Sequence, residues 1–255
     1  GRILARRRVA TPRHDYRRTL EAIAELVVGI QSELGERASV GVGTPGSLSP
    51  FSGRIRNANS VWLNGQRLAR DLADILGSPV RIANDANCFA LSEAIDGAGR
   101  SARCVFGVIV GTGTGGGVVV DGRLLTGPNR IAGEWGHNPL PWPNRDELPG
   151  PPCYCGKCGC IETFLSGPGL AADFRRASRR RLRPAEISAA ADAGDDQAEA
   201  ALRRYEDRMA RALAGVINTY VFSDEITLDL RPPVHGDSSG VRGAAWLWPK
   251  RQPPP

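Results

Sequence analysis

Four cysteines, Cys153, Cys155, Cys158 and Cys160, fall within eight residues of a loop-rich stretch. The surrounding segment, residues 127–159, contains seven prolines, and a loop of that length in a compact domain needs a cross-link. No apolar stretch of signal-peptide length occurs near Gly1, so we expect a cytoplasmic protein, in which clustered thiols bind a metal rather than pair as disulfides. The cluster therefore predicts a metal-binding site that cross-links this loop.

The ligand set that fits best is His137 with Cys153, Cys155 and Cys160, because three thiolates and one imidazole match a closed tetrahedral zinc site. Cys153 follows His137 by 16 positions, which gives the chain room to fold back. Cys158 is a fourth candidate, so one cysteine of the cluster is a spare thiol. A zinc-ribbon nucleic-acid module is the alternative, but such ribbons use two separated cysteine pairs.

Composition points to an ordinary globular chain, with 41% hydrophobic residues among 255 and a formal net charge of +6. Only two of the 33 basic residues are lysines, and the densest basic run, Arg175–Arg183, has no aromatic residues interleaved for base stacking. We expect that run to be a solvated face and expect no nucleic-acid partner. The apolar runs are far shorter than the roughly 20 residues of a membrane span, so no membrane partner is expected. Cys88 and Cys104 stand in apolar surroundings and are expected to be inert core residues.

Periodicity predicts alternating helices and strands, hence an α/β fold. The expected helices and strands are Tyr16–Leu34 (helix), Ser39–Gly43 (strand), Gln66–Leu76 (helix), Val80–Ala83 (strand), Ala86–Asp96 (helix), Cys104–Val110 and Gly117–Val120 (strands), Pro184–Thr219 (mostly helical) and a turn with a short helix over Gly236–Trp248.

The glycine-rich segment between the two later strands, Gly111–Gly117, formally contains GxGxxG. A dinucleotide-binding fold would require a helix next, yet a strand and a hairpin turn follow, and no GK[ST] is present for a P-loop. A glycine hairpin can still offer backbone N–H groups to phosphate oxygens, because the backbone approaches closely without Cβ atoms. Phosphate binding and a plain tight turn both remain open from this pattern.

Asn84 and Asp85 stand where a short strand ends, at the edge where open α/β sheets bind ligands. Asp85 also precedes a helix, so helix capping is the local alternative. The GDSSG sequence at Gly236–Gly240 fits a hydrolase nucleophile elbow, but no histidine follows Ser238, which excludes that triad order.

Taken together, GTPGSLSP, RNANSVWLNG, ANDANCFALSEA, GTGTGGG, AGEWGHNPLPW and CYCGKCGCIETFLSG resemble the ROK family of sugar kinases and repressors, in that family's order. Within it the motifs are most similar to bacterial fructokinases of mannokinase type, with N-acetylglucosamine kinase second. The resemblance implies an α/β, two-lobed, actin-like and hexokinase-like (ribonuclease H-like) ATPase fold, a general base in Asp85, ATP with Mg²⁺ as cosubstrate, a hexose as phosphoryl acceptor, structural Zn²⁺ and a homodimer.

The resemblance also implies roles for individual residues. Substrate contacts are expected from Gly46, Asn59, Asn84, Asp85, Glu134, His137 and Glu162. Nucleotide phosphate contacts are expected from Gly111, Thr112, Gly113, Thr114, Gly115 and Gly116. The zinc would hold the loop of His137 against that of Glu162.

Two departures from the family concern the nucleotide side. ROK kinases begin with a strand carrying DxGGTK, which lies upstream of the first residue here, and after Tyr220 they carry a strand, a GGG turn for adenosine and a helix. We therefore expect a truncated N-terminal sugar-binding lobe over residues 1–97. The expected C-terminal lobe, residues 98–255, carries the glycine hairpin, the zinc loop and a shortened nucleotide-binding part. A degenerate, non-catalytic sugar-binding protein or a repressor fragment is the alternative to a kinase.

Overall fold

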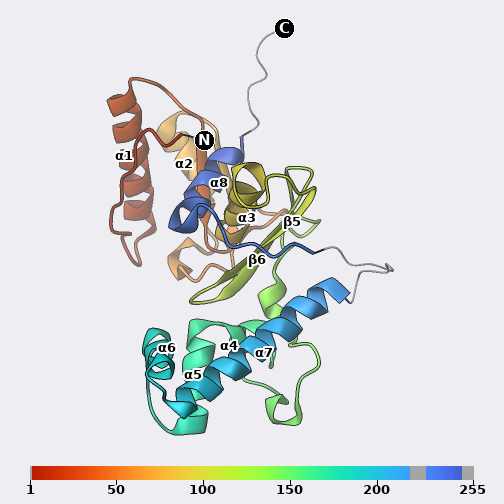
Figure 1. Ribbon diagram of the computed structural model, residues 1–255. Coiled ribbons are helices and arrows are strands. Elements are labelled where there is room, and N and C mark those ends of the chain that lie inside the picture. The colour runs from red at the N-terminus through yellow and green to blue at the C-terminus, as the bar shows by residue number, and fades with distance from the viewer. Residues whose placement is uncertain (1, 219–227, 249–255) are drawn as a thin grey trace. The chain divides into compact units, whose positions relative to one another are not determined.

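The computed structural model describes residues 2–218 and 228–248, and the chain separates into two compact units (Figure 1). The first unit comprises residues 1–107, 117–133 and 231–255, and the second comprises residues 108–116 and 134–230. The expected lobe boundary between residues 97 and 98 is a different division and stays a prediction. The region after Tyr220 that the sequence suggests is shortened lies outside the described residues.

The first unit contains α1 (Tyr16–Leu34), β1 (Val40–Thr44), β2 (Ser47–Leu48), β3 (Ile55–Arg56), η1 (Val61–Leu63), α2 (Leu68–Leu76), β4 (Val80–Asn84), α3 (Asp85–Asp96), β7 (Arg123–Leu125), η4 (Gly236–Ser238) and α8 (Ser239–Trp246). The strands β5 (Cys104–Val110) and β6 (Thr114–Val120) run through the division between the units.

Helix α1 has the bounds that the sequence predicted, because both of its ends are fixed locally. The Asp15 carboxylate accepts a hydrogen bond from the Arg18 N–H at the start, and Gly35 ends the helix in the left-handed conformation. Its apolar face carries Leu20 into a core with Leu72 of α2 and Ile55 of β3. The same core receives Val42 and Ile82 from the parallel strand pair β1 and β4.

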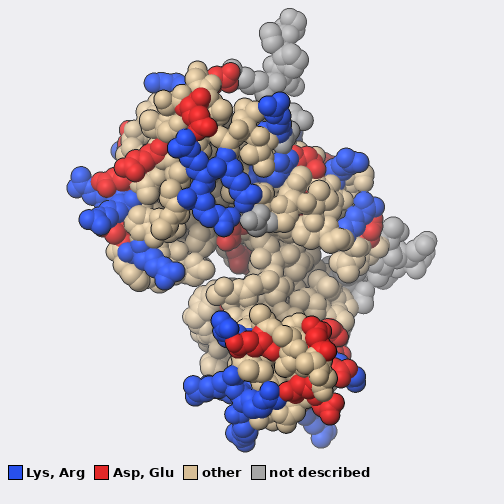
Figure 2. All heavy atoms as spheres, turned by 60° about the vertical axis from the view of Figure 1, so that its left-hand side comes forward, with Lys and Arg blue, Asp and Glu red and all other residues tan. Residues whose placement is uncertain are grey.

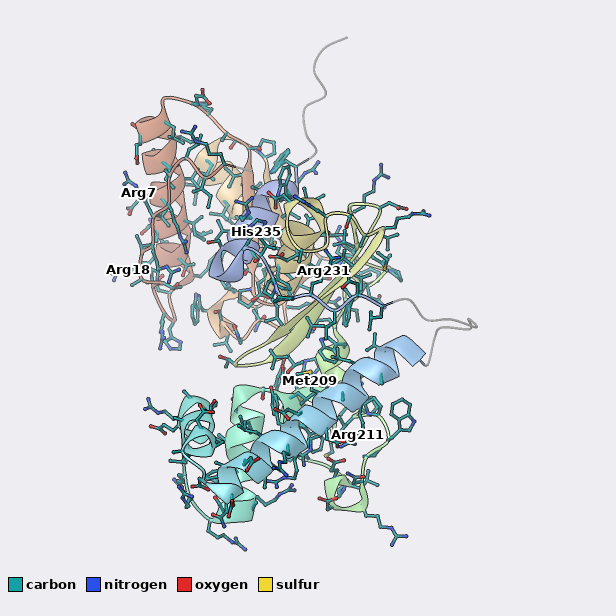
Figure 3. All side chains as sticks on the ribbon, viewed as in Figure 1. Arg7, Arg18, Met209, Arg211, Arg231 and His235 are labelled. Carbon is teal, nitrogen blue, oxygen red and sulfur yellow. The ribbon has the colours of Figure 1, made fainter. Side chains whose placement is uncertain are left out.

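The last described helix, α8, packs along α3 although about 150 positions separate them in sequence (Figure 1). Gly243 permits this approach, since a Cβ atom there would lie 1.6 Å from the Cys88 carbonyl oxygen. The Glu93 carboxylate of α3 accepts hydrogen bonds from the Val234 and His235 N–H groups and from the Ser239 hydroxyl. The C-terminal segment, with His235 and Arg231 labelled in Figure 3, is thereby fastened to the helix that begins at Asp85.

Strands β5, β6 and β7 form one sheet in that order, and β6 turns into β7 through Asp121 and Gly122 as the predicted hairpin. Gly117 of β6 lets α3 approach the sheet, because a Cβ atom there would lie 2.8 Å from the Ala86 carbonyl oxygen. The expectation for Cys104 was wrong: the residue is exposed, since it begins β5 at the end of the sheet beside a surface turn. Cys88 is buried as expected, and burial raises the pKa of its thiol to about 12.

The second unit contains η2 (Trp135–His137), η3 (Arg145–Glu147), α4 (Ile161–Leu165), α5 (Gly167–Ser178), α6 (Pro184–Asp192) and α7 (Asp196–Asn218). Its helices pack around Phe174, Ile187 and Ala201, which confirms the helical expectation for the region after Pro184.

A buried network of charges ties the loop before the cysteine cluster to α7. Arg208 is only 1% exposed, donates to Glu147 at 2.7 Å and lies 3.1 Å from Asp173 of α5. Arg211, which projects from α7 in Figure 3, adds hydrogen bonds at 2.9 and 3.0 Å to the Glu147 carboxylate. Each buried charge therefore has a partner of opposite sign, which is the condition under which buried ions are tolerated.

We expect this network to make the protein acid-sensitive. Burial alone would raise the pKa of Glu147, but hydrogen bonds from Arg211 and Arg208 outweigh it and lower the pKa from 4.5 to about 2. A lowered pKa contributes stability that is complete above pH 4.5 and is lost as pH falls toward 2.

The substitution Glu147→Gln should cost about 3 kcal/mol at pH 7, because it removes one of the two carboxylates that face the buried Arg208 and leaves only Asp173. Urea denaturation at pH 7, 4 and 3 checks both points. The variant should lose less stability between pH 4.5 and 3 than the unchanged chain does, and equal losses would contradict the assigned pKa.

The arginine run 175–183 is solvent-exposed, apart from Ser178 and Leu182, which are half-buried. Several of its arginines pair with acidic residues, as Arg180 does with Asp195 and Arg183 with Glu186. Basic and acidic side chains both occur across the face drawn in Figure 2. Within residues 2–218 and 228–248, every helix is too short or too polar to cross a membrane.

Candidate functional site

In the first unit, the candidate residues gather where β4 ends and α3 begins. The Asn84 side chain caps α3 by accepting hydrogen bonds from the Ala86 and Asn87 N–H groups, and its amide donates to the Gly46 carbonyl at 3.0 Å. Capping, which the sequence offered as an alternative role for Asp85, is thus performed mainly by Asn84. Asp85 is the first helical residue, and its carboxylate accepts from the Ala86 N–H at 2.9 Å.

Burial is the main influence on Asp85 and raises the pKa of its carboxyl above the ordinary value, against hydrogen bonds that lower it. A carboxylate that is partly desolvated is a better proton acceptor than one in water. A raised pKa is the direction of shift that suits a carboxylate to accept a proton.

Gly46 forms a tight turn against the segment that carries Asn59. Gly46 has a φ of 75°, and a Cβ atom there would lie 2.4 Å from the Arg56 carbonyl oxygen. Asn59 itself is exposed in the bend after β3. Its neighbour Ala58 is held on both backbone groups by the Asn64 side chain, at 2.9 and 3.0 Å.

Asn64 was not singled out from the sequence. The Asn64-Gly65 pair, a strong turn signal, could have identified it as the residue that shapes this bend.

In the second unit, Glu162 of α4 reaches the glycine turn. Its carboxylate accepts the Thr114 N–H at 2.8 Å, and a Cβ atom on Gly113 would lie 2.6 Å from the same oxygen. The Gly111 N–H donates to the Gly113 carbonyl at 2.8 Å, which closes the turn between β5 and β6. The expected phosphate contacts of residues 111–116 stay a prediction. Gly111 and Thr112 are exposed, whereas the Thr114 N–H is already bonded to the Glu162 carboxylate.

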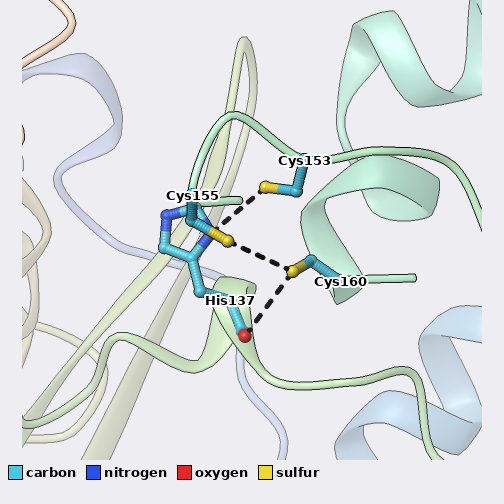
Figure 4. A group of neighbouring side chains, drawn as sticks. All are labelled: His137, Cys153, Cys155 and Cys160. Carbon is cyan, nitrogen blue, oxygen red and sulfur yellow. Dashed lines mark hydrogen bonds between the residues drawn. The ribbon is translucent and has the colours of Figure 1, made fainter. Parts of the chain in front are cut away.

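The expected metal ligands do come together. The ligand atoms of His137, Cys153, Cys155 and Cys160 all lie within 4.8 Å of one another (Figure 4). His137 Nδ1 is 3.6 Å from Cys153 Sγ, and Cys155 Sγ is 3.6 Å from Cys160 Sγ. Two sulfur ligands at tetrahedral angles on one zinc ion lie about 3.8 Å apart, so the cluster has the dimensions of a zinc site.

Local structure explains why these four residues converge. Isolated bridges pair Pro139 with Cys160 and Pro152 with Cys158, and the Cys153 N–H donates to the Lys157 carbonyl at 2.8 Å to close the cysteine turn. Cys158 is exposed and outside the cluster, as the spare thiol was expected to be. Burial raises the pKa of the Cys160 thiol to about 12, so a cation is needed to hold it as a thiolate.

The loop that carries Glu134 and His137 is anchored by Trp135. Its indole N–H donates to the Gly115 carbonyl at 2.8 Å, and Gly136 leaves no room for a Cβ atom, which would lie 2.0 Å from the Thr114 carbonyl oxygen. His137 and Glu162 are therefore both fixed to the same glycine strand, Glu162 through the Thr114 N–H. The sequence did not predict Trp135 as an anchor, because its partner lies 20 positions away.

Comparison with known proteins agrees with these motifs. The ROK family model matches residues 1–226. An N-acetyl-D-glucosamine kinase of Shigella flexneri serotype 5b is 37% identical, with 94% of this chain and 90% of the relative covered. That match runs over 273 positions, more than the 255 residues here, so the relative carries residues inside the matched span that this chain lacks.

Solved structures give the same result. A ROK hexokinase from Thermus thermophilus superposes with a TM-score of 0.81 at 31% identity, with 93% of this chain and 88% of that chain covered. A ROK transcriptional regulator, a homolog of the E. coli MLC protein, gives a TM-score of 0.66 at 26% identity but is covered over only 52% of its length. The fold is thus the α/β fold of ROK hexokinases. The chain belongs to the ROK family and is related over most of its length to that family's sugar kinases.

Proposed function

We propose that the protein transfers the γ-phosphoryl group of ATP to a hydroxyl of a hexose or an N-acetylhexosamine. The observation that carries the proposal is the Asp85 carboxylate, which begins α3 directly after β4, is accessible to solvent and has its pKa raised by partial desolvation. Phosphoryl transfer needs little covalent chemistry from the protein beyond a base for the attacking hydroxyl and the positioning of the two substrates. Asp85 would accept the proton of that hydroxyl as its oxygen attacks phosphorus.

The other candidate residues are proposed to bind rather than react. Asn59 in the first unit and Glu134, His137 and Glu162 in the second offer the amide, carboxylate and imidazole groups that pair with sugar hydroxyls. Asn84 is already committed to the α3 cap and to Gly46, so its proposed contribution is to fix the loop and the start of α3 beside Asp85. The cluster of His137 and the three cysteines is proposed to hold one structural Zn²⁺.

N-acetylglucosamine is the proposed substrate. The 37% identical relatives are N-acetyl-D-glucosamine kinases, which supports the second of the two substrates suggested by the sequence rather than the fructokinase-type activity that stood first. A site that pairs an acetamide leaves polar groups unpaired when a simple hexose binds, at a cost of about 1 to 3 kcal/mol for each group.

We expect kcat/KM for N-acetylglucosamine to exceed that for fructose, mannose and glucose by at least about fivefold, which corresponds to the lower end of that cost. A coupled ADP-release assay on the whole gene product, including any residues that flank the 255 printed, measures the four values. Equal kcat/KM values for fructose and N-acetylglucosamine would restore the fructokinase-type reading. Sugar-independent ADP release would remove the kinase proposal.

A sugar-responsive regulator is the second candidate, because the chain also matches the ROK transcriptional regulator. The kinases are favoured, since about 90% of their length is matched against 52% for the regulator. Sugar binding without ADP release in the same assay would favour the regulator or the non-catalytic sugar-binding protein.

A further inference from the structure

The two ring nitrogens of His137 face different partners. Nδ1 lies 3.6 Å from Cys153 Sγ inside the cysteine cluster, whereas Nε2 lies 2.9 Å from the hydroxyl oxygen of Tyr154. When Nδ1 is a metal ligand, Nε2 carries the ring hydrogen and donates it. The Tyr154 hydroxyl is then the acceptor of a hydrogen bond that the proposed function reserves for a sugar hydroxyl.

Two carboxylates complete the surroundings of this phenol. The negatively charged carboxylates of Glu162 and Glu134 interact electrostatically with the Tyr154 phenol. A phenol carries an O–H group, so Tyr154 has a hydrogen to donate in a region of carboxylate acceptors. An oxygen that accepts from an imidazole N–H and donates toward a carboxylate is what a bound sugar hydroxyl would be at this place.

The Tyr154 side chain is held weakly, although its backbone is fixed. The residue stands between the ligands Cys153 and Cys155, in the turn closed by the Cys153 N–H, yet it is 76% exposed. Its ring meets the His137 ring edge to face, with the centroids 5.1 Å apart. Rotation of the side chain away from His137 thus breaks one hydrogen bond and one ring contact and disturbs no packed core.

We propose that the Tyr154 hydroxyl occupies the sugar-hydroxyl position at His137 Nε2 while the site is empty, and that an incoming sugar displaces it by rotation of the side chain. On this view Tyr154, which is part of the zinc-binding turn, lowers the affinity for the sugar because its hydroxyl competes for His137 Nε2. The inference rests on the proposed function, which gives Glu134, His137 and Glu162 to the sugar.

The substitution Tyr154→Phe keeps the ring and removes the hydroxyl that competes with the sugar. The dissociation constant for N-acetylglucosamine, measured by calorimetry on the zinc-loaded protein, should fall about 2- to 10-fold, the equivalent of one net hydrogen bond. Zinc content should stay unchanged. Tyr16→Phe is the matched control, because it removes a phenol bonded to Asp71 in the first unit and should change the dissociation constant less than twofold.

A second measurement observes the displacement directly. In protein labelled with 3-fluorotyrosine, the resonance absent from Tyr154→Phe identifies Tyr154, and saturating N-acetylglucosamine should move it toward the position of a solvent-exposed tyrosine. Unchanged or weaker binding by Tyr154→Phe, or a resonance that the sugar does not move, would overturn the inference while leaving sugar binding itself in place. Absence of any sugar binding by zinc-loaded unmodified protein would instead remove the proposed function, and this inference with it.

Discussion

Replacing Asp85 by Asn is expected to lower kcat by about 10² to 10⁴, the range for losing a general base, while sugar affinity changes only a few fold. Asn has nearly the same shape and can still accept the Ala86 N–H that Asp85 accepts at 2.9 Å, so the start of α3 should be preserved. The coupled assay is run on the whole gene product. A fall in kcat of less than tenfold would show that Asp85 acts only at the helix start.

The same substitution should make the protein more stable at neutral pH. Burial raises the pKa of Asp85 in the folded state, so the ionised carboxylate opposes folding above that pKa, and this cost disappears as pH falls through it. Asn carries no charge and avoids the cost at every pH. A higher Tm together with a lower kcat would mark Asp85 as a residue kept for activity. Loss of a helix N-cap would instead lower Tm. The control is Asn84→Ala, which removes the α3 cap and is expected to lower stability by about 1 kcal/mol.

The pH dependence of turnover gives an independent check on the base. Activity requires the ionised carboxylate, so kcat/KM should fall on the acid side as pH drops through the raised pKa of Asp85. That fall should occur at higher pH than for a solvent-exposed aspartate.

Removal of the metal is expected to have the other large effect. Protein purified without chelator should carry about one zinc per chain, and Cys155→Ser should lose it, because three protein ligands cannot close a tetrahedral structural site. Zinc binds structural sites in small peptides with an apparent free energy of about 10 to 16 kcal/mol. The loop that carries His137 should therefore lose its order without the ion. Metal analysis and thermal melting with and without chelator provide the measurements.

Cys158→Ser is the matched control for this prediction, since Cys158 lies in the same turn but is exposed and outside the cluster. It should retain zinc and melting temperature. Zinc-free protein, or a Cys155→Ser variant with unchanged zinc content, would contradict the assignment of a zinc site. Loss of zinc in Cys158→Ser would show that the ligand set differs from the four residues of Figure 4.

The sequence by itself determined the features whose causes are local. Helix α1 runs from Tyr16 to Leu34 because Asp15 caps its start and Gly35 ends it, both within a few residues of the helix. Two further features were predictable for the same reason: the turn at Asp121 and Gly122, and the grouping of His137 with three cysteines. Turn residues and metal-ligand spacing both depend on short stretches of sequence.

Tertiary structure decided which of several capable groups takes each role. Asn84 rather than Asp85 mainly caps α3, because the Gly46 carbonyl, 38 positions earlier, holds the Asn84 amide in place. Cys104 is exposed because its position at the end of β5 outweighs its apolar neighbours.

The most distant contacts show the same limit. Glu162 meets the Thr114 N–H across 48 positions, and Arg208 meets Glu147 across 61. Propensity and periodicity describe a residue's own segment, whereas burial, pKa and hydrogen-bond partners depend on segments that only folding brings near.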